Sequence, residues 1–169
     1  LLHRKRLPGP VETINKGTMR SLLPIFNTAS EVGYGATISS LASFVVIKDG
    51  IVGVFPEWPL ISESISINLL AGITGSASGG LSIALEALGD SYLALAETAN
   101  ISPELLHRVA TLASGGFDTL PHNGAVITLL AICGLTHRQS YLDIFAVALV
   151  VPFLATAGVV VLGTLFGAF

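Results

Sequence analysis

Two short interruptions in otherwise apolar sequence carry the side chains that could bind a polar ligand. The first is the glycine and serine run 75–80, and the second is segment 117–124, which holds a carboxylate, a hydroxyl, an imidazole and an amide. Each precedes an apolar stretch that predicts a helix, and a helix N-terminus offers free N–H donors and partial positive charge to an anion. The pattern predicts a site for a hydroxylated carboxylate, formed by Gly75, Ser76, Ser78, Gly79, Asp118, Thr119, His122 and Asn123.

Several of these residues also have a simpler structural explanation. Gly75 and Gly79 form a GxxxG pattern, which is typical of a helix-packing face. His122 could be an internally hydrogen-bonded structural histidine, and Asp118 could cap or orient the break without touching a ligand. The position of His122 in a polar break between two apolar half-helices favours the site, whereas the two roles of Asp118 stay open.

The composition indicates a membrane protein. Of the 169 residues, 51% are hydrophobic and 11% are charged, against roughly 25% charged residues in an average soluble domain. Segments 64–85 and 144–169 contain no formal charge, and the second is long enough to cross a bilayer. With a net charge of −3, this composition excludes a water-soluble enzyme domain, a nucleic-acid binder and a disordered linker. No motif indicates a metal site, and the single Cys133 excludes an internal disulfide.

The elements that must position the two interruptions follow from the apolar pattern. We predict an all-α polytopic fold in which residues 1–20 form a cytoplasmic loop and residues 21–169 a transmembrane domain. Ser102-Pro103-Glu104 predicts a helix start, because serine caps well, proline suits the first helical position and an acid suits the first turn. The domain then comprises a spanning helix over 21–47, a re-entrant hairpin over 60–89, a broken helix over 103–135, a polar loop over 136–140 and a final spanning helix over 141–169.

Broken backbone within a membrane is itself a functional signal. Unsatisfied N–H and C=O groups cost several kcal/mol each in hydrocarbon, so such segments persist only where protein packs around them or where they line a watery cavity.

Glu31 is an ionisable residue within the first predicted spanning helix, and such residues are expensive and usually functional. Asn27 and Gly35 lie four residues on either side, on the same helix face. Two interpretations stay open. Glu31 is a proton carrier, or it is a packing carboxylate hydrogen-bonded to Asn27 or to a neighbouring helix.

The distribution of lysine and arginine predicts an orientation under the positive-inside rule. With the N-terminus in the cytoplasm and the hairpin re-entrant, six cations lie inside (Arg4, Lys5, Arg6, Lys16, Arg20 and Arg138) and two outside (Lys48 and Arg108). A hairpin that spans would put Arg138 outside, which is a weaker split. The missing start methionine and the apolar run that reaches Phe169 indicate a piece of a larger protein, its C-terminal part.

Several segments resemble the gluconate:H+ symporter (GntP-type) permeases. The resemblance is carried by residues 70–85, 107–110 and 135–145, and above all by residues 114–130, which read SGGFDTLPHNGAVITLL. It covers most of the chain after about residue 10.

The resemblance implies a secondary transporter of the ion-transporter superfamily, built from two inverted repeats that each carry a re-entrant hairpin and a broken helix. This chain would be the second repeat, in the inner membrane, with the remaining N-terminal repeat and the lipid bilayer as its partners. A homodimer stays open. The implied activity is proton-coupled uptake of gluconate or a related small hydroxy-carboxylate, with the proton as coupling ion and no other cofactor. Glu31 and His122 are the predicted proton-coupling residues, Glu31 on the physical argument alone.

Two other classes compete with a transporter. Ser76-Ala77-Ser78-Gly79 is close to the GxSG of rhomboid-type intramembrane serine proteases, with Ser78 as nucleophile and His122 as base. However, Ser76 replaces the first glycine of that motif, and the nucleophile would lie in a hairpin tip. A channel or structural membrane subunit is the other class, and the sequence lacks the ring-forming pattern of charges that would favour it. We therefore expect a transporter and no enzymatic activity.

Overall fold

The computed structural model describes residues 9–52, 55 and 57–166, without the side chains of Glu31, Lys48 and Val52. All regular structure in these residues is helical, which confirms the all-α fold class. In chain order the elements are α1 (Pro10–Ser39), α2 (Ala42–Val52), α3 (Pro59–Thr74), α4 (Ala77–Thr98), α5 (Pro103–Ser114), the 3-10 turn η2 (Phe117–Thr119), α6 (Gly124–Cys133), α7 (His137–Ile144), the π-helical segment η3 (Phe145–Val150) and α8 (Val151–Phe166).

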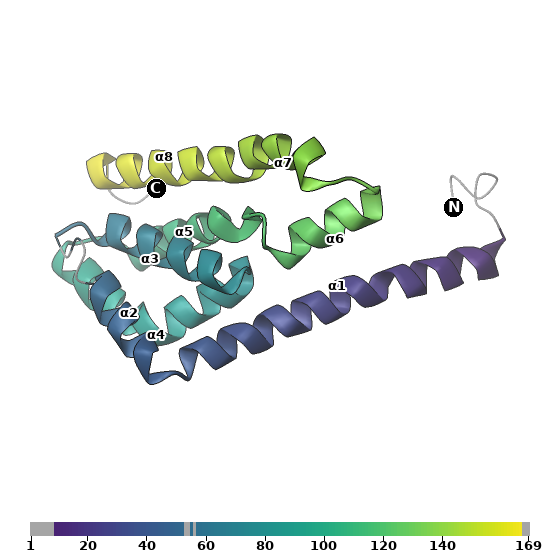
Figure 1. The fold of residues 1–169 in the computed structure, drawn as a ribbon. Helices are drawn as coiled ribbons and strands as arrows, with labels where there is room; N and C mark the ends of the chain where they lie inside the picture. The colour runs from purple at the N-terminus through teal and green to yellow at the C-terminus, as the bar shows by residue number, and fades with distance from the viewer. Residues whose placement is uncertain (1–8, 53–54, 56, 167–169) are drawn as a thin grey trace.

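Helices α3 and α4 form a hairpin whose turn is only Gly75 and Ser76 (Figure 1). Gly75 ends α3 with a φ of 67°, a left-handed conformation that glycine adopts without strain. Ser76 begins α4 by accepting a hydrogen bond from the Gly79 N–H at 3.2 Å. The two helices approach each other closely at Gly80, where an added Cβ would overlap the backbone of Ala71. The hairpin is present, and its re-entrant position in a membrane stays a prediction.

The second predicted break also forms. Helix α5 begins after Ser102, whose hydroxyl accepts from the Leu105 N–H at 3.2 Å. It ends at Ser114, the chain passes through η2, and helix resumes in α6 at Gly124. Helix α6 ends at Cys133, and the next residue, Gly134, has a φ of 66°.

Elements α7, η3 and α8 form one continuous helix, His137–Phe166, drawn in green to yellow in Figure 1. Among the described residues it is the one helix long and apolar enough by itself to cross a membrane, while α1 and α2 pass the same test only when taken together. Its large apolar side chains are mostly exposed, including Leu142 at 83% and Leu165 at 69%.

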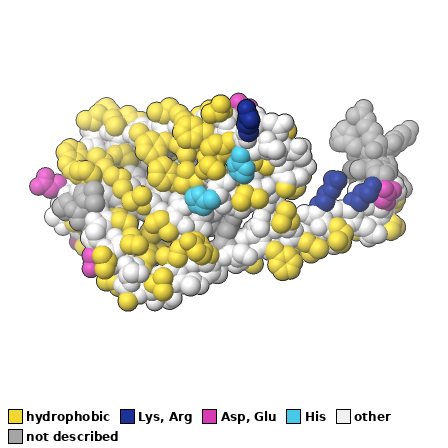
Figure 2. All heavy atoms as spheres, viewed as in Figure 1, with side chains coloured by type: hydrophobic (Ala, Val, Ile, Leu, Met, Phe, Trp, Pro, Cys, Tyr) yellow, Lys and Arg dark blue, Asp and Glu magenta, His cyan; other side chains and the backbone are white. Residues whose placement is uncertain are grey.

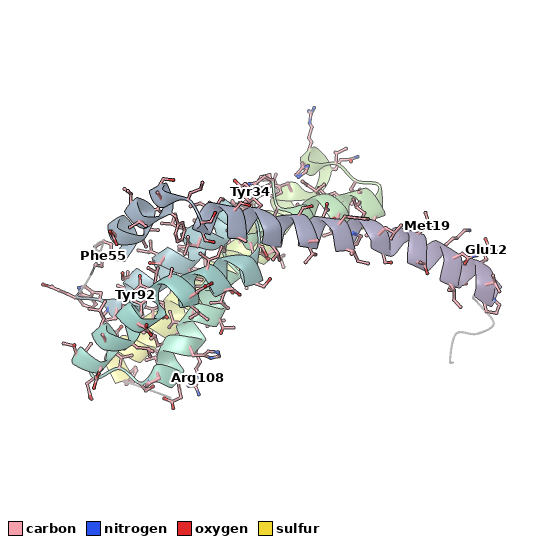
Figure 3. The ribbon with its side chains drawn as sticks, turned by 90° about the horizontal axis from the view of Figure 1, so that it is seen from below. Glu12, Met19, Tyr34, Phe55, Tyr92 and Arg108 are labelled. Atoms are coloured by element: carbon pink, nitrogen blue, oxygen red, sulfur yellow. The ribbon has the colours of Figure 1, made fainter. Side chains whose placement is uncertain are left out.

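Helix α1 leaves the rest of the molecule as a long arm. Figure 3 shows Glu12 and Met19 on the part that projects, and Tyr34 where α1 meets the other helices. Large apolar side chains on the projecting part are exposed, among them Met19 at 68%. Figure 2 shows one face of the body on which hydrophobic side chains dominate, with the visible charged groups near its margins.

The structure corrects several expected boundaries. Helix α1 begins at Pro10 rather than at residue 21, because proline suits a first helical turn and Lys16 pairs with Glu12 at 2.6 Å one turn away. It ends at Ser39 and turns into α2, so residues 21–47 are not one straight helix. The predicted cations Arg4, Arg6 and Lys5 lie outside the described residues, as does the side chain of Lys48.

Two further boundaries differ. Helix α4 continues to Thr98, beyond the predicted hairpin end at 89. Its acidic residues Glu86, Asp90 and Glu97 are all solvent-exposed, so their charges do not end the helix. The expected loop 136–140 is mostly helix, because Thr136 and Gln139 form a capping box that starts α7 at His137.

Helix α3 lies at the centre of the packing and contacts α4, α5 and η2, while α8 packs on α5. The core is formed by buried apolar residues of these helices, including Ile67, Leu70, Leu88, Leu105, Val109 and Val160. The two breaks are therefore held against a packed centre, and they lie beside each other.

Candidate functional site

Asp118 joins the two predicted breaks directly. Its Oδ1 atom accepts a hydrogen bond from the backbone N–H of Ala77 at 2.6 Å, and Ala77 is the first residue of α4. The carboxylate thus occupies the positive end of that helix, where an anion is stabilised by the helix dipole and by a free N–H donor. Of the two roles that the sequence left open for Asp118, the structure shows capping across the break.

Asn123 completes the connection from the other side. Its Oδ1 atom caps α6 by accepting from Ala125 N at 2.6 Å and Val126 N at 3.3 Å. Its Nδ2 group donates to Asp118 Oδ1 at 3.0 Å and to the carbonyl oxygen of Gly75 in the hairpin turn. With a side chain only 1% exposed, Asn123 uses both ends of its amide to fix the N-termini of α4 and α6 side by side.

The second break is also attached to the long apolar helix. The Thr119 hydroxyl donates to the carbonyl oxygen of Ala148 at 3.1 Å, and the Tyr141 hydroxyl donates to the carbonyl oxygen of Thr119 at 3.1 Å. Pro152 has no N–H, so the Ala148 carbonyl lacks the donor four residues on that a regular helix supplies. The Thr119 hydroxyl supplies a donor in its place, within the π-helical segment η3, where the backbone hydrogen-bond pattern of the helix changes.

We therefore expect Thr119→Val to destabilise the protein by about 1–3 kcal/mol, because it leaves a carbonyl without its side-chain donor. Thr119→Ser keeps the hydroxyl and should lose less than half as much. Thermal unfolding of the full-length protein in detergent measures both variants. A larger loss in Thr119→Ser than in Thr119→Val would show that packing of the methyl group, and not the hydrogen bond, holds the break.

An open cleft of about 510 Å³ lies next to the paired breaks. Ser30 and Tyr34 of α1 line one wall, and residues 72–75 at the end of α3 line another. His122 and Gly124 complete it. The His122 Nε2 atom lies 2.9 Å from the carbonyl oxygen of Gly72, in hydrogen-bonding contact, and the imidazole stays exposed.

Helix α1 is held at this cleft by Asn27. Its Nδ2 group donates to the Thr128 hydroxyl at 2.5 Å and to the carbonyl oxygen of Gly124 at 3.3 Å. Asn27, Ser30 and Tyr34 recur on one face of α1 at a helical spacing, and Glu31 belongs to the same stretch of backbone. The Glu31 side chain lies outside the described residues, so its two interpretations stay open.

The structure brings together five of the eight predicted binding residues, namely Gly75, Ser76, Asp118, His122 and Asn123. Gly79 serves the Ser76 cap, and Thr119 bonds to η3. The exposed Ser78 has its hydroxyl 3.4 Å from that of Ser76. Since His122 contacts Gly72, the hydrogen bonds recorded for Ser78 and His122 do not pair them as nucleophile and base.

Ser30 and Tyr34 are site residues that sequence reasoning passed over. Ser30 and Tyr34 follow Asn27 by three and seven residues, so a helical wheel of this segment, centred on Asn27, would have found them. Among the described residues, no group of three or more His, Cys, Asp or Glu side chains could hold a metal ion.

Comparison with known proteins gives one informative relative. The chain is 52% identical over 139 residues to the uncharacterized transporter YxjC of Bacillus subtilis (strain 168). The match covers 82% of this chain and 29% of the relative, so the chain spans under a third of that protein's length. No protein-family model matches the chain, and no solved structure matches it.

Proposed function

We propose that this chain is part of a secondary active transporter that carries gluconate or a related small hydroxy-carboxylate into the cell with protons. One observation carries the proposal: two interrupted helical segments meet through Asp118 and Asn123 beside an open cleft. Paired breaks of this kind are where transporters present half-helix ends to a substrate. The identity to a protein named as a transporter and the apolar, exposed helix 137–166 support it.

The cleft offers a chemistry that suits such a substrate. The α6 N-terminus reaches it at Gly124, so a carboxylate there would meet partial positive charge. Ser30 and Tyr34 bring hydroxyls, and His122 brings an exposed imidazole, which together would bind the hydroxyl groups of a sugar acid. Gly75 and Ser76 with Asp118 and Asn123 hold the walls in place. We also propose that Ser78, Gly79 and Thr119 contact the substrate, at other steps of the transport cycle.

Within this proposal, the protein is a multi-pass protein of the inner membrane, and this chain is its second, GntP-type repeat. The partner of the chain is then the remaining N-terminal repeat. Glu31 and His122 are the coupling residues that the sequence favours. His122 suits that role because it lies at the cleft and its imidazole can both accept and donate a proton.

Uptake of radiolabelled gluconate by the full-length protein in proteoliposomes tests the function. An inward proton gradient should drive accumulation, and unlabelled gluconate and shorter hydroxy acids should compete. His122→Ala should lower uptake about tenfold or more if the imidazole binds substrate or proton. Thr98→Ala, at an exposed residue of α4 that does not line this cleft, is the control. Absence of gradient-driven uptake for the whole panel of hydroxy acids would overturn the proposed substrate class.

A further inference from the structure

Glu63 is a buried carboxyl that the cleft does not use. It lies near the start of α3 with 2% of its surface exposed, and its Oε2 atom has no hydrogen-bond partner among the described residues. An ionised carboxylate in this place would have lost its water without gaining a donor or a cation, which costs several kcal/mol. The packing around Glu63 therefore accommodates the neutral, protonated carboxyl.

A cavity of about 130 Å³ lies against this residue, between α3, α4 and α5. The titratable side chains on its wall, besides Glu63, are Tyr92 of α4 and His107 of α5. Most of the remaining wall is apolar, including Ile67, Leu93 and Leu106, and no lysine or arginine lines it. With no lysine or arginine on this wall, protonation of Glu63 itself is the direct way to neutralise its charge.

The cavity connects the buried carboxyl to the surface. His107 lines the same cavity and is exposed, so the space extends from Glu63 to a side chain in contact with the outside of the chain. The volume exceeds what one water molecule needs, and Glu63 and His107 are the groups on the wall that could hydrogen-bond to it. The cavity thus offers a route between Glu63 and the surface of the chain.

The hydroxyl groups near Glu63 are hydrogen-bonded to one another. Tyr92 is labelled in Figure 3, and its hydroxyl is hydrogen-bonded to the hydroxyl of Ser62 at 3.2 Å and to that of Ser66. These bonds join α3 to α4 and use the polar capacity of Tyr92 away from the carboxyl. Tyr92 lines the same cavity as Glu63.

We propose that Glu63 is a proton-binding residue of the transport cycle, loaded and unloaded through the cavity that ends at His107. This inference rests on the proposed transport function and adds to the coupling residues that the sequence favours. Helix α3 carries Glu63 near one end and the cleft residues Gly72 to Gly75 at the other. Loss of the proton would put an unpaired charge in the core of the hairpin, so protonation and the position of the hairpin turn are coupled through one rigid helix.

The test uses the full-length protein in proteoliposomes with radiolabelled gluconate. In the wild type, one unit of inward pH gradient can sustain accumulation of about tenfold per coupled proton. Glu63→Gln mimics the permanently protonated form, so it should keep gluconate exchange while the accumulation ratio falls towards one. Glu86→Gln, at an exposed glutamate of α4, is the matched control and should accumulate like the wild type. Glu63→Asp keeps the carboxyl and should keep gradient-driven accumulation with a changed pH dependence.

Infrared difference spectroscopy gives a readout that needs no substrate. A pH jump should reveal the C=O stretching band of a protonated carboxyl in the wild type and in Glu86→Gln, and that band should be missing in Glu63→Gln. An unchanged band in Glu63→Gln, or full accumulation by that variant, would overturn the role of Glu63. Absence of gluconate exchange in the wild type would instead contradict the proposed function, and the infrared band would then still decide whether Glu63 exchanges a proton.

Discussion

Gly80→Ala is expected to unfold the α3–α4 hairpin or to shift its two helices apart, with a loss of at least about 3 kcal/mol. The new Cβ would overlap the backbone of Ala71, and a backbone cannot rotate away as a side chain can. Because the hairpin turn carries Gly75 and Ser76, the separation would also pull the Ala77 N–H from Asp118. Gradient-driven uptake should fall with the stability of the protein.

The same substitution elsewhere in α4 provides the control. Gly89→Ala adds its methyl group where nothing lies within 4 Å, and alanine is the better helix former by about 1 kcal/mol. We therefore expect Gly89→Ala to be neutral or stabilising in thermal unfolding of the full-length protein. If both variants unfold at the same temperature, the close approach of α3 and α4 at Gly80 is wrong.

Asn123→Ala should be the most damaging change at the candidate site. It removes the cap of α6, and it leaves the Gly75 carbonyl and the Asp118 carboxylate without their amide donor. A lost cap costs typically about 1 kcal/mol, and each buried polar group left unpaired adds about 1–3 kcal/mol. We expect a total loss of at least about 3 kcal/mol and no measurable uptake.

A second capping residue separates the two contributions. Ser102 caps α5 through one hydrogen bond to the Leu105 N–H, so Ser102→Ala should cost only about 1 kcal/mol. The excess loss in Asn123→Ala over Ser102→Ala measures the bonds that cross between the breaks. An excess near zero would contradict the view that Asn123 holds the breaks together.

The features that the sequence predicts well are local ones. The start of α5 follows from Ser102-Pro103-Glu104, three adjacent residues that each favour a helix N-terminus. The two breaks follow from glycine, and in the second also from proline, within apolar sequence. The second lies where it is predicted, whereas the first is shorter than the predicted run 75–80, because Ser76 caps a helix that already begins at Ala77. The capping box of Thr136 and Gln139 is an equally local signal, although the run of polar residues 136–140 predicts a loop.

The meeting of the breaks was predicted only as a shared site, and its hydrogen bonds could not be deduced. Asp118 is 41 residues from Ala77, and Asn123 is 48 residues from Gly75. No periodicity relates such positions, because their proximity depends on how α3, α4 and α5 pack. The burial of Glu63 could not be predicted for the same reason. A glutamate among serines near a helix start is usually solvent-exposed, and the packing of α4 and α5 against α3 is what removes Glu63 from water.

The contact between α1 and α6 sets an order of assembly during synthesis. Asn27 precedes its partner Thr128 by 101 residues, so at about 5–20 residues per second the partner emerges from the ribosome on the order of 5–20 s later. The α3–α4 hairpin closes across a two-residue turn and can form as soon as it is made. The wall of the cleft that α1 contributes is therefore completed only after the hairpin and the second break exist. A stall in translation between these points would leave a nascent chain with a finished hairpin and an open cleft.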